Sequence, residues 1–261
     1  MSRTGKPNSD FQPTTVQSVD NCFELIDAMR SLGGEAGVTE IADATQLSKS
    51  SVHKHLMTLW KQGFVVKSQH NYRLSLRFLE MGGYVRSQLP ASRYIKEKVV
   101  DLAHETSEVA FFHTEENGRS TILFREVGSN GVSTRSYVGM RTYLHQTAAG
   151  KAILSQYSEQ RVEEIVEQTG LPKATEQTIT DFDDLLADLA LTRERGYTLS
   201  VEEATDGLMA VGVPIKLPNG EVLGGCAVAG PVHRIRNRSE DELPQILHSV
   251  ANELELNITY S

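Results

Sequence analysis

The amino-acid sequence predicts a two-domain α/β protein: a small N-terminal unit of three helices and a hairpin, then a larger α+β domain with an antiparallel sheet. Three observations predict it. Helical patterns followed by a short polar hairpin fill the first third of the chain, strands alternate with helices over the rest, and the charge changes sign between the two parts. With 261 residues, 39% of them hydrophobic, each part can bury a core of its own.

The first helix is predicted to follow a short tail, residues 1–17. This tail lacks the apolar core that a signal peptide needs, and we expect it to be disordered. Apolar side chains then recur at helical spacing until Gly33 and Gly34 end the pattern. The apolar residues at this spacing are Val19, Cys22, Phe23, Leu25, Ile26 and Met29.

Two more helices follow at once. Thr39 is expected to cap the second helix, which runs to about Thr45. Ser48 is expected to cap the third helix, which Gly63 ends, and His55 should be a partly buried packing residue on it. The side chains predicted to face the core from the third helix are Val52, Leu56, Leu59 and Trp60.

A hairpin completes the N-terminal unit. Residues 64–76 predict two strands around a polar turn at 69–71. Three helices and a basic hairpin make a winged helix-turn-helix, which we place over residues 18–76. In that arrangement the third helix enters the major groove of DNA.

The distribution of charge supports a polyanionic partner. The chain carries a net charge of -8, yet no Asp or Glu occurs between Asp43 and Glu80. Residues 1–90 hold 10 basic and 8 acidic side chains, and residues 91–261 hold 16 and 26. Lys and Arg near phosphates release counterions, whereas a solvated helix face usually mixes both signs. The candidate contacts to double-stranded DNA are Ser48, Lys49, Ser50, Ser51, His53, Lys54, Lys61, Lys67 and Arg73.

A linker helix is predicted over residues 77–91, weakened by Gly82 and Gly83. A helix that leads out of a DNA-binding module also suits contacts between two copies of the chain, so we expect self-association. The domain boundary should fall near residues 88–92.

The remaining residues, 92–261, predict a domain in which strands and helices alternate. Glu115–Gly118 forms the turn of a hairpin, Asp181 caps a helix that Gly196 ends, and Pro218–Gly220 joins two strands. The predicted strands lie in 109–128, 131–144, 197–205, 208–217 and 221–230, and the predicted helices in 91–108, 147–158, 159–170, 181–196 and 239–258.

The sequence gives no positive support for catalysis, a cofactor, a metal site or a membrane span. Cys22 and Cys226 are far apart and are expected to be buried, free thiols, which indicates a reducing, cytoplasmic setting. No run of about 18 apolar residues occurs. The segment "HQTAAGKAI" fails the phosphate-loop pattern at His145 and Ala152, so Lys151 is expected on the surface of its helix.

Three segments resemble the IclR family of transcriptional regulators. They are "GVTEIADATQLSKSSVHKHLMTLWKQGFV", "LHQTAAGKAIL" and "RERGYTLSVEEATDGLMAVGVPIKLPNGEVLGGCAVAGP", and the similarity extends from about Val19 to Ile258. The phrase "YRLSLRFLEMGGYVRS" and the acidic composition are similar to haloarchaeal members. The resemblance implies operator binding by dimers or dimers of dimers, and a GAF/PAS-like C-terminal domain that binds a small-molecule effector.

The resemblance also implies where the effector binds. Backbone amides at Ala148 and Ala149 would hold its carboxylate, and Ser200, Ala210, Ala227 and Ala229 would surround its body. Relatives that bind small keto acids tend to have Asp, Cys, Ser and Ser at the last four positions. The smaller side chains here imply a bulkier ligand, such as a sugar-derived acid.

Two matters stay open at this point. The nearby acids Glu202, Glu203 and Asp206 fit a solvated loop as well as a ligand or metal contact. The alternative to a regulator is a metabolite-binding module or a metabolic enzyme whose N-terminal helices serve dimerisation. The window without acidic residues favours the regulator, because a dimerisation module has no reason to exclude them.

Overall fold

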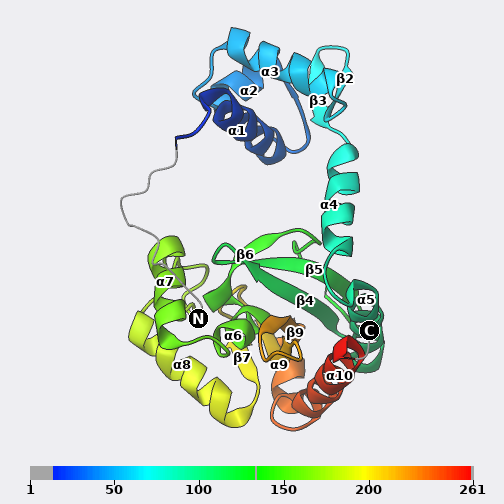
Figure 1. Ribbon diagram of the computed structural model, residues 1–261, viewed down its shortest axis with the longest axis vertical. Helices are drawn as coiled ribbons and strands as arrows, with labels where there is room; N and C mark the ends of the chain where they lie inside the picture. The colour runs from blue at the N-terminus through cyan, green and yellow to red at the C-terminus, as the bar shows by residue number, and fades with distance from the viewer. Residues whose placement is uncertain (1–13, 133, 260–261) are drawn as a thin grey trace. The chain divides into compact units, whose positions relative to one another are not determined.

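The computed structural model describes residues 14–132 and 134–259, and the chain divides into two compact units, one up to Val85 and one from Arg86 onward (Figure 1). The division falls within α4 (Arg77–Ser87), a few residues before the boundary expected from the sequence. The tail predicted over residues 1–17 lies almost wholly outside the described residues.

The first unit is a three-helix bundle with a small antiparallel sheet, in the strand order β1-β3-β2. Its core is formed by buried apolar residues of the three helices and by Ala36, Val65 and Tyr72 from the sheet. The elements are α1 (Gln17–Ser31), β1 (Glu35–Gly37), α2 (Val38–Ala44), α3 (Lys49–Lys61), β2 (Val65–Ser68) and β3 (Asn71–Leu74). The three helices and the hairpin confirm the winged helix-turn-helix, and β1 is an additional strand that pairs with β3.

Two local predictions in this unit are wrong. Thr39 does not cap α2, because the cap residue is Gly37, two residues earlier, and the Glu40 carboxylate accepts the Gly37 N–H at 2.8 Å. Trp60 does not face the core, since its exposed fraction is 49%. Leu59 already continues the buried stripe of α3, and Trp60 lies about 100° further around the helix.

The second unit is built on a six-stranded antiparallel sheet in the order β6-β5-β4-β9-β8-β7. Its strands are β4 (Val109–Glu116), β5 (Arg119–Val127), β6 (Arg141–Tyr143), β7 (Thr198–Val201), β8 (Leu208–Lys216) and β9 (Val222–Pro231). Its longer helices are α5 (Ser92–Thr106), α6 (Ala148–Leu154), α7 (Glu159–Thr169), α8 (Phe182–Arg195) and α10 (Glu242–Thr259). Short helical turns, which the sequence did not indicate, occur at η1 (Leu144–Gln146), α9 (Val232–Ile235) and η2 (Arg236–Arg238).

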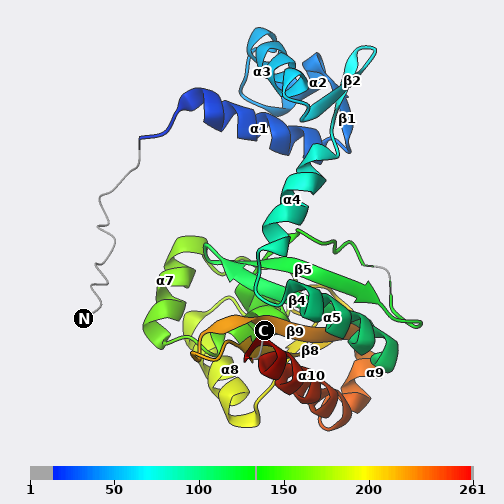
Figure 2. The ribbon, with the colours of Figure 1, turned by 45° about the vertical axis from the view of Figure 1, so that its right-hand side comes forward.

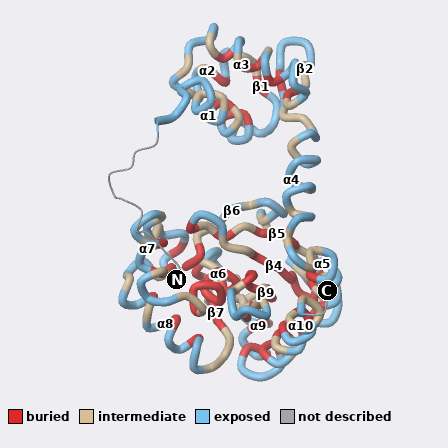
Figure 3. The backbone as a smooth tube through the Cα atoms, viewed as in Figure 1, coloured by how far each residue is buried: buried red, intermediate tan, exposed pale blue. Residues whose placement is uncertain are grey.

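Helices cover both faces of this sheet (Figures 1 and 2). On one face, α5 and α10 pack on the strands around Ala110 and Phe112. Val109 and Phe111, which alternate with these residues along β4, lie on the opposite face. That second face carries α6, behind which α7 and α8 pack. Buried residues gather in the middle of the unit (Figure 3).

Glycines let the backbone of α6 approach the sheet closely. A Cβ on Gly225 would lie 2.3 Å from the Ala149 carbonyl oxygen, and one on Gly212 would lie 2.9 Å from the Ala148 carbonyl carbon. The Thr198 hydroxyl, on β7, donates to the Ala148 carbonyl at 2.8 Å and so fixes the first turn of α6. The start of α6 is therefore held at a defined position above β8 and β9.

Candidate functional site

The first candidate site is the outer surface of α3. Ser48 caps this helix as predicted, since its hydroxyl accepts the Ser51 N–H at 3.2 Å. Lys49, Ser50, His53 and Lys54 are exposed along the N-terminal half, while His55 is half-buried as expected. The sequence of α3 thus separates a buried apolar stripe from an exposed polar one that has no acidic side chain.

The candidate cations are available to bind phosphates. In the described part of the chain, the ion pairs include none of Lys49, Lys54, Lys61, Lys67 and Arg73, and all five side chains are exposed. Arg77 has a different environment, because its guanidinium donates to the Gln62 carbonyl and lies 4.9 Å from the centre of the Phe64 ring. Arg77 therefore joins α4 to the end of α3 and the start of the wing.

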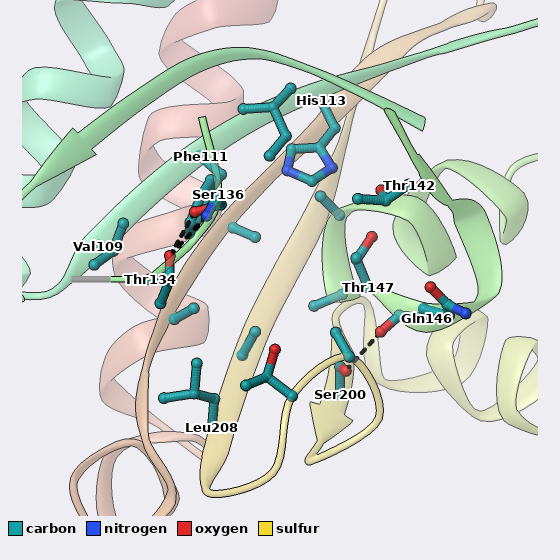
Figure 4. Close-up of a pocket in the computed structure, with 18 of the residues that line it drawn as sticks. Val109, Phe111, His113, Thr134, Ser136, Thr142, Gln146, Thr147, Ser200 and Leu208 are labelled. Atoms are coloured by element: carbon teal, nitrogen blue, oxygen red, sulfur yellow. Dashed lines mark hydrogen bonds between the residues drawn. The ribbon is translucent and has the colours of Figure 1, made fainter. Parts of the chain in front are cut away.

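The second candidate site is a cavity of about 250 Å³ between the sheet of the second unit and α6 (Figure 4). Strands β4, β8 and β9 form its floor, and the start of α6 and the loops before β6 and β8 form its walls. All six residues proposed for effector binding line this one cavity: Ala148, Ala149, Ser200, Ala210, Ala227 and Ala229. The sheet brings together positions that lie up to 81 residues apart in the sequence.

Hydrogen bonds fix the wall that α6 contributes. The Thr147 hydroxyl caps the helix by accepting the Gly150 N–H at 3.1 Å. The Ser200 hydroxyl donates to the Gln146 carbonyl at 3.2 Å and ties β7 to the same turn. The N–H groups of Ala148 and Ala149, as the first amides of a helix, have no acceptor within it. They are donors suited to an anionic group.

The sequence did not single out two polar residues that line the cavity. His113 lies on β4 and its Nδ1 is 2.9 Å from the Ser120 hydroxyl, and Thr142 lies on β6 beside Ser120 in the strand register. Burial lowers the pKa of His113 to about 4, so its ring is neutral near pH 7. No local motif marks these residues, because only strand pairing brings β4, β5 and β6 side by side.

Lys151 is not on the surface of its helix, and this prediction was wrong. Its side chain is fully buried, donates to Glu203 Oε1 at 2.9 Å and lies 3.0 Å from Asp188 Oδ2. The Glu203 side chain is buried too and pairs with Lys151, so it is not part of a solvated surface. Burial raises the pKa of Glu203, which the neighbouring Lys151 partly opposes. Glu202 accepts the Gly207 N–H at 2.7 Å and shapes the same loop.

Several broader features bear on the class of protein. Both cysteines are free, with Cys226 buried and Cys22 half-buried. Among the residues that the structure describes, no cluster of His, Cys, Asp or Glu is arranged to hold a metal ion. The helices within the described ranges include none that is long and apolar enough to cross a membrane.

Comparison with known proteins gives consistent matches for both units. The family model described as "Bacterial transcriptional regulator IclR C-terminal" matches residues 86–256, and the IclR helix-turn-helix model matches residues 18–69. A probable HTH-type transcriptional regulator, ArcR of Halobacterium salinarum, is 30% identical over 254 residues, which cover 95% of each chain. These relatives are described as transcriptional regulators, so the alternative of a metabolic enzyme is not favoured.

Solved structures support the same fold. The crystal structure of the Thermotoga maritima IclR has a TM-score of 0.77 at 26% identity, over 94% of this chain and 99% of that one. An IclR homolog from Microbacterium hydrocarbonoxydans, complexed with 4-hydroxybenzoate, has a TM-score of 0.78 at 18% identity, over 94% and 100% of the two chains. On the family matches and these structures, the chain belongs to the IclR family of transcriptional regulators, with an N-terminal helix-turn-helix domain for DNA and a C-terminal effector-binding domain.

Proposed function

We propose that this regulator binds operator DNA through the first turns of α3 and through the β2–β3 wing. Ser48, Lys49, Ser50, Ser51, His53 and Lys54 contact bases and phosphates at the start of the helix, while Lys61, Lys67 and Arg73 contact the backbone. The observation that carries this proposal is the set of exposed cations that form no ion pair with any described residue, in a chain of net charge -8. The acidic remainder repels DNA and confines contact to this surface.

The cavity of the second unit is the proposed effector site. The amides of Ala148 and Ala149 face a volume of about 250 Å³ whose floor is lined by alanines, which leaves room for a body larger than a two-carbon acid. An organic acid, including a sugar-derived one, fits this description. The 4-hydroxybenzoate complex of the Microbacterium homolog supports a carboxylate ligand for a domain of this fold.

Self-association through α4 is part of the proposal. Leu76, Leu79 and Val85 are exposed on and beside this helix, with 69% of Leu79 accessible. Exposed apolar residues that recur along one helix are typical of an interaction face. A symmetric cytoplasmic dimer would bind pseudo-palindromic DNA with half-sites about one helical turn apart, or a multiple of that.

The test is binding of the purified protein to DNA from upstream of its own gene and the neighbouring genes, measured by fluorescence anisotropy across a salt series. Sequence-specific binding that weakens steeply with salt supports the proposal, because each phosphate contact releases counterions. Absence of specific binding at every salt concentration, with and without candidate acids, would contradict it.

A further inference from the structure

The cavity of the second unit has a polar end, which carries Thr142 and Thr147, and a mostly apolar end, which carries Val109 and Leu208 together with Thr134 and Ser136 (Figure 4). His113 lies at the polar end, beside the start of α6: it pairs in register with Gly225, and the Ala149 carbonyl lies directly over Gly225. Thr142 and Thr147 also line the cavity and are drawn on the same side of it in Figure 4. The apolar side chains that line the cavity include Val109, Phe111, Val132, Leu208 and Met209, and the Phe111 ring lies 5.7 Å, centre to centre, from the His113 ring.

The His113 ring lines the cavity, and only one of its two nitrogens has a partner among the described residues. The side chain is 4% exposed, and Nδ1 is occupied by Ser120. No partner for Nε2 is found among the residues that the structure describes. When the Ser120 hydroxyl donates to Nδ1, Nε2 carries the ring proton and can donate it to a ligand. The buried ring is neutral at pH 7, so it offers this donor without adding charge.

Thr142 offers a second free group at the same end. Its neighbour across the β5–β6 pair is Ser120, whose hydroxyl is already hydrogen-bonded to His113. The Thr142 Oγ1 atom is buried and lacks a hydrogen-bond partner within the described residues. Burying a hydroxyl without a partner costs free energy, and native structures rarely tolerate this unless a ligand or water completes the bond.

The polar end contains donors but no cation. Arg135 is the one Lys or Arg among the described residues that line the cavity, and it is exposed between Thr134 and Ser136. Figure 4 shows those two residues on the side of Val109 and Phe111, away from Thr142. Neutral N–H and O–H donors suit a single charge spread over two oxygens. A doubly charged phosphate buried without a cation would be strongly disfavoured.

We propose that His113 and Thr142 bind the carboxylate of the effector, and that the effector is a monocarboxylate with an apolar body. This inference rests on the proposed effector site. The His113 Nε2–H and the Thr142 hydroxyl donate to the carboxylate from the sheet, and the amides of Ala148 and Ala149 donate from α6. The body then extends past Phe111, whose ring lies beside His113, toward Val109 and Leu208.

Calorimetric titration with matched probes tests the effector class. Benzoate carries the proposed charge and apolar body, benzamide has the same shape without the charge, and gluconate has the charge on a hydroxylated body. We expect the full-length protein to bind benzoate at least tenfold more tightly than benzamide or gluconate. If gluconate binds more tightly than benzoate, or benzamide binds as tightly as benzoate, the effector is not a monocarboxylate with an apolar body.

Substitutions test the two residues. Thr142→Val keeps the shape and removes a hydroxyl that has no partner in the free protein, so it should leave thermal stability intact and weaken benzoate binding about tenfold to a hundredfold. His113→Asn keeps a side-chain amide that can hydrogen-bond Ser120 but has no donor at the position of Nε2. His113→Gln places its amide N–H near the position of Nε2. The Gln variant should therefore bind benzoate more tightly than the Asn variant.

The outcomes separate this inference from the proposed function. Unchanged benzoate affinity in Thr142→Val and His113→Asn, with weakened affinity in Ala148→Pro, would overturn the roles of His113 and Thr142 and leave the effector site in place. Loss of binding in Arg135→Ala alone would place the carboxylate at the exposed rim and would also overturn them. If none of the three probes binds, the monocarboxylate class is overturned, while operator binding still tests the regulator independently.

Discussion

The Lys151 ammonium lies 2.9 Å from Glu203 Oε1, and this buried contact ties α6 to the loop between β7 and β8. Both connected segments line the cavity: α6 through Ala148 and Ala149, and the loop through Ala204 and Thr205. Asp188 on α8 completes the cluster at 3.0 Å. Two walls of the proposed effector site are thus held together by a largely buried cluster of charges.

Lys151→Met should therefore destabilise the second unit. The substitution leaves two carboxylates facing each other without a cation, and removing one partner of a buried pair typically costs ~3–5 kcal/mol. The free energy of unfolding from urea titrations checks this value. The double variant Lys151→Met/Glu203→Gln should recover part of the loss, because it removes one unpaired buried charge.

A matched control is available in the exposed pair of Lys173 and Glu176, whose charged atoms lie 2.6 Å apart. Lys173→Ala should cost no more than ~1 kcal/mol, because solvent screens the pair. A comparable cost for Lys151→Met and Lys173→Ala would contradict the importance of the buried cluster.

Lys49→Ala and Lys54→Ala should weaken operator binding. Loss of a base contact is expected to cost ~1–3 kcal/mol, and loss of a phosphate contact should reduce the salt dependence by about one counterion. Fluorescence anisotropy across a salt series separates the two cases. Lys96→Ala removes an equally exposed cation from the second unit and should leave both quantities unchanged. Unaltered affinity in both α3 variants would argue against α3 as the recognition helix.

Ala148→Pro should weaken the effector response while preserving DNA binding. The residue occupies the first position of α6, where proline is tolerated, and Thr147 before it is already extended, with φ -120° and ψ 147°. The substitution removes one N–H from the cavity wall. The effector response is measured as the release of operator DNA when the candidate organic acid is added at constant pH. Glu159→Pro, at the first position of α7, is the control, and an equal effect of the two prolines would show that backbone disturbance is responsible.

Acid should destabilise the protein in part through His113. Its pKa falls from 6.5 to about 4 on burial, so the unfolded chain binds a proton between these values while the folded protein does not. Stability is therefore lost as the pH falls from about 6.5 to about 4, by up to ~3 kcal/mol. Urea titrations at pH 7 and pH 5 should show a smaller difference for His113→Gln than for the wild type. An identical difference would show that the ring is not held neutral.

Local chemistry allowed much of the fold to be predicted from the sequence. Ser48 and Asp181 cap their helices through side-chain oxygens, and Gly196 ends α8 in a left-handed conformation with φ +83°. These signals depend on a few neighbouring residues, so they can be recognised without tertiary information. The hairpin turn at Asn117–Gly118, with φ of 54° and 73°, is another such local signal.

The environments of single side chains were harder to predict. Trp60 appeared to continue an apolar face, but the packing of α1 and α2 ends that face at Leu59. Lys151 appeared to be a surface cation, and its partners come from α8 and a loop 52 residues away. The cavity role of His113 depends on which strands become neighbours. Each of these features is set by long-range packing that a local pattern does not encode.

Trp60 is the single tryptophan of the chain, and its exposed indole lies on the helix proposed to bind DNA. Intrinsic tryptophan emission therefore reports on the first unit alone, while the cavity of the second unit contributes no signal of its own. A change in this emission when an acid fills the cavity would be a direct optical record of communication between the two units, obtained without a label and without DNA.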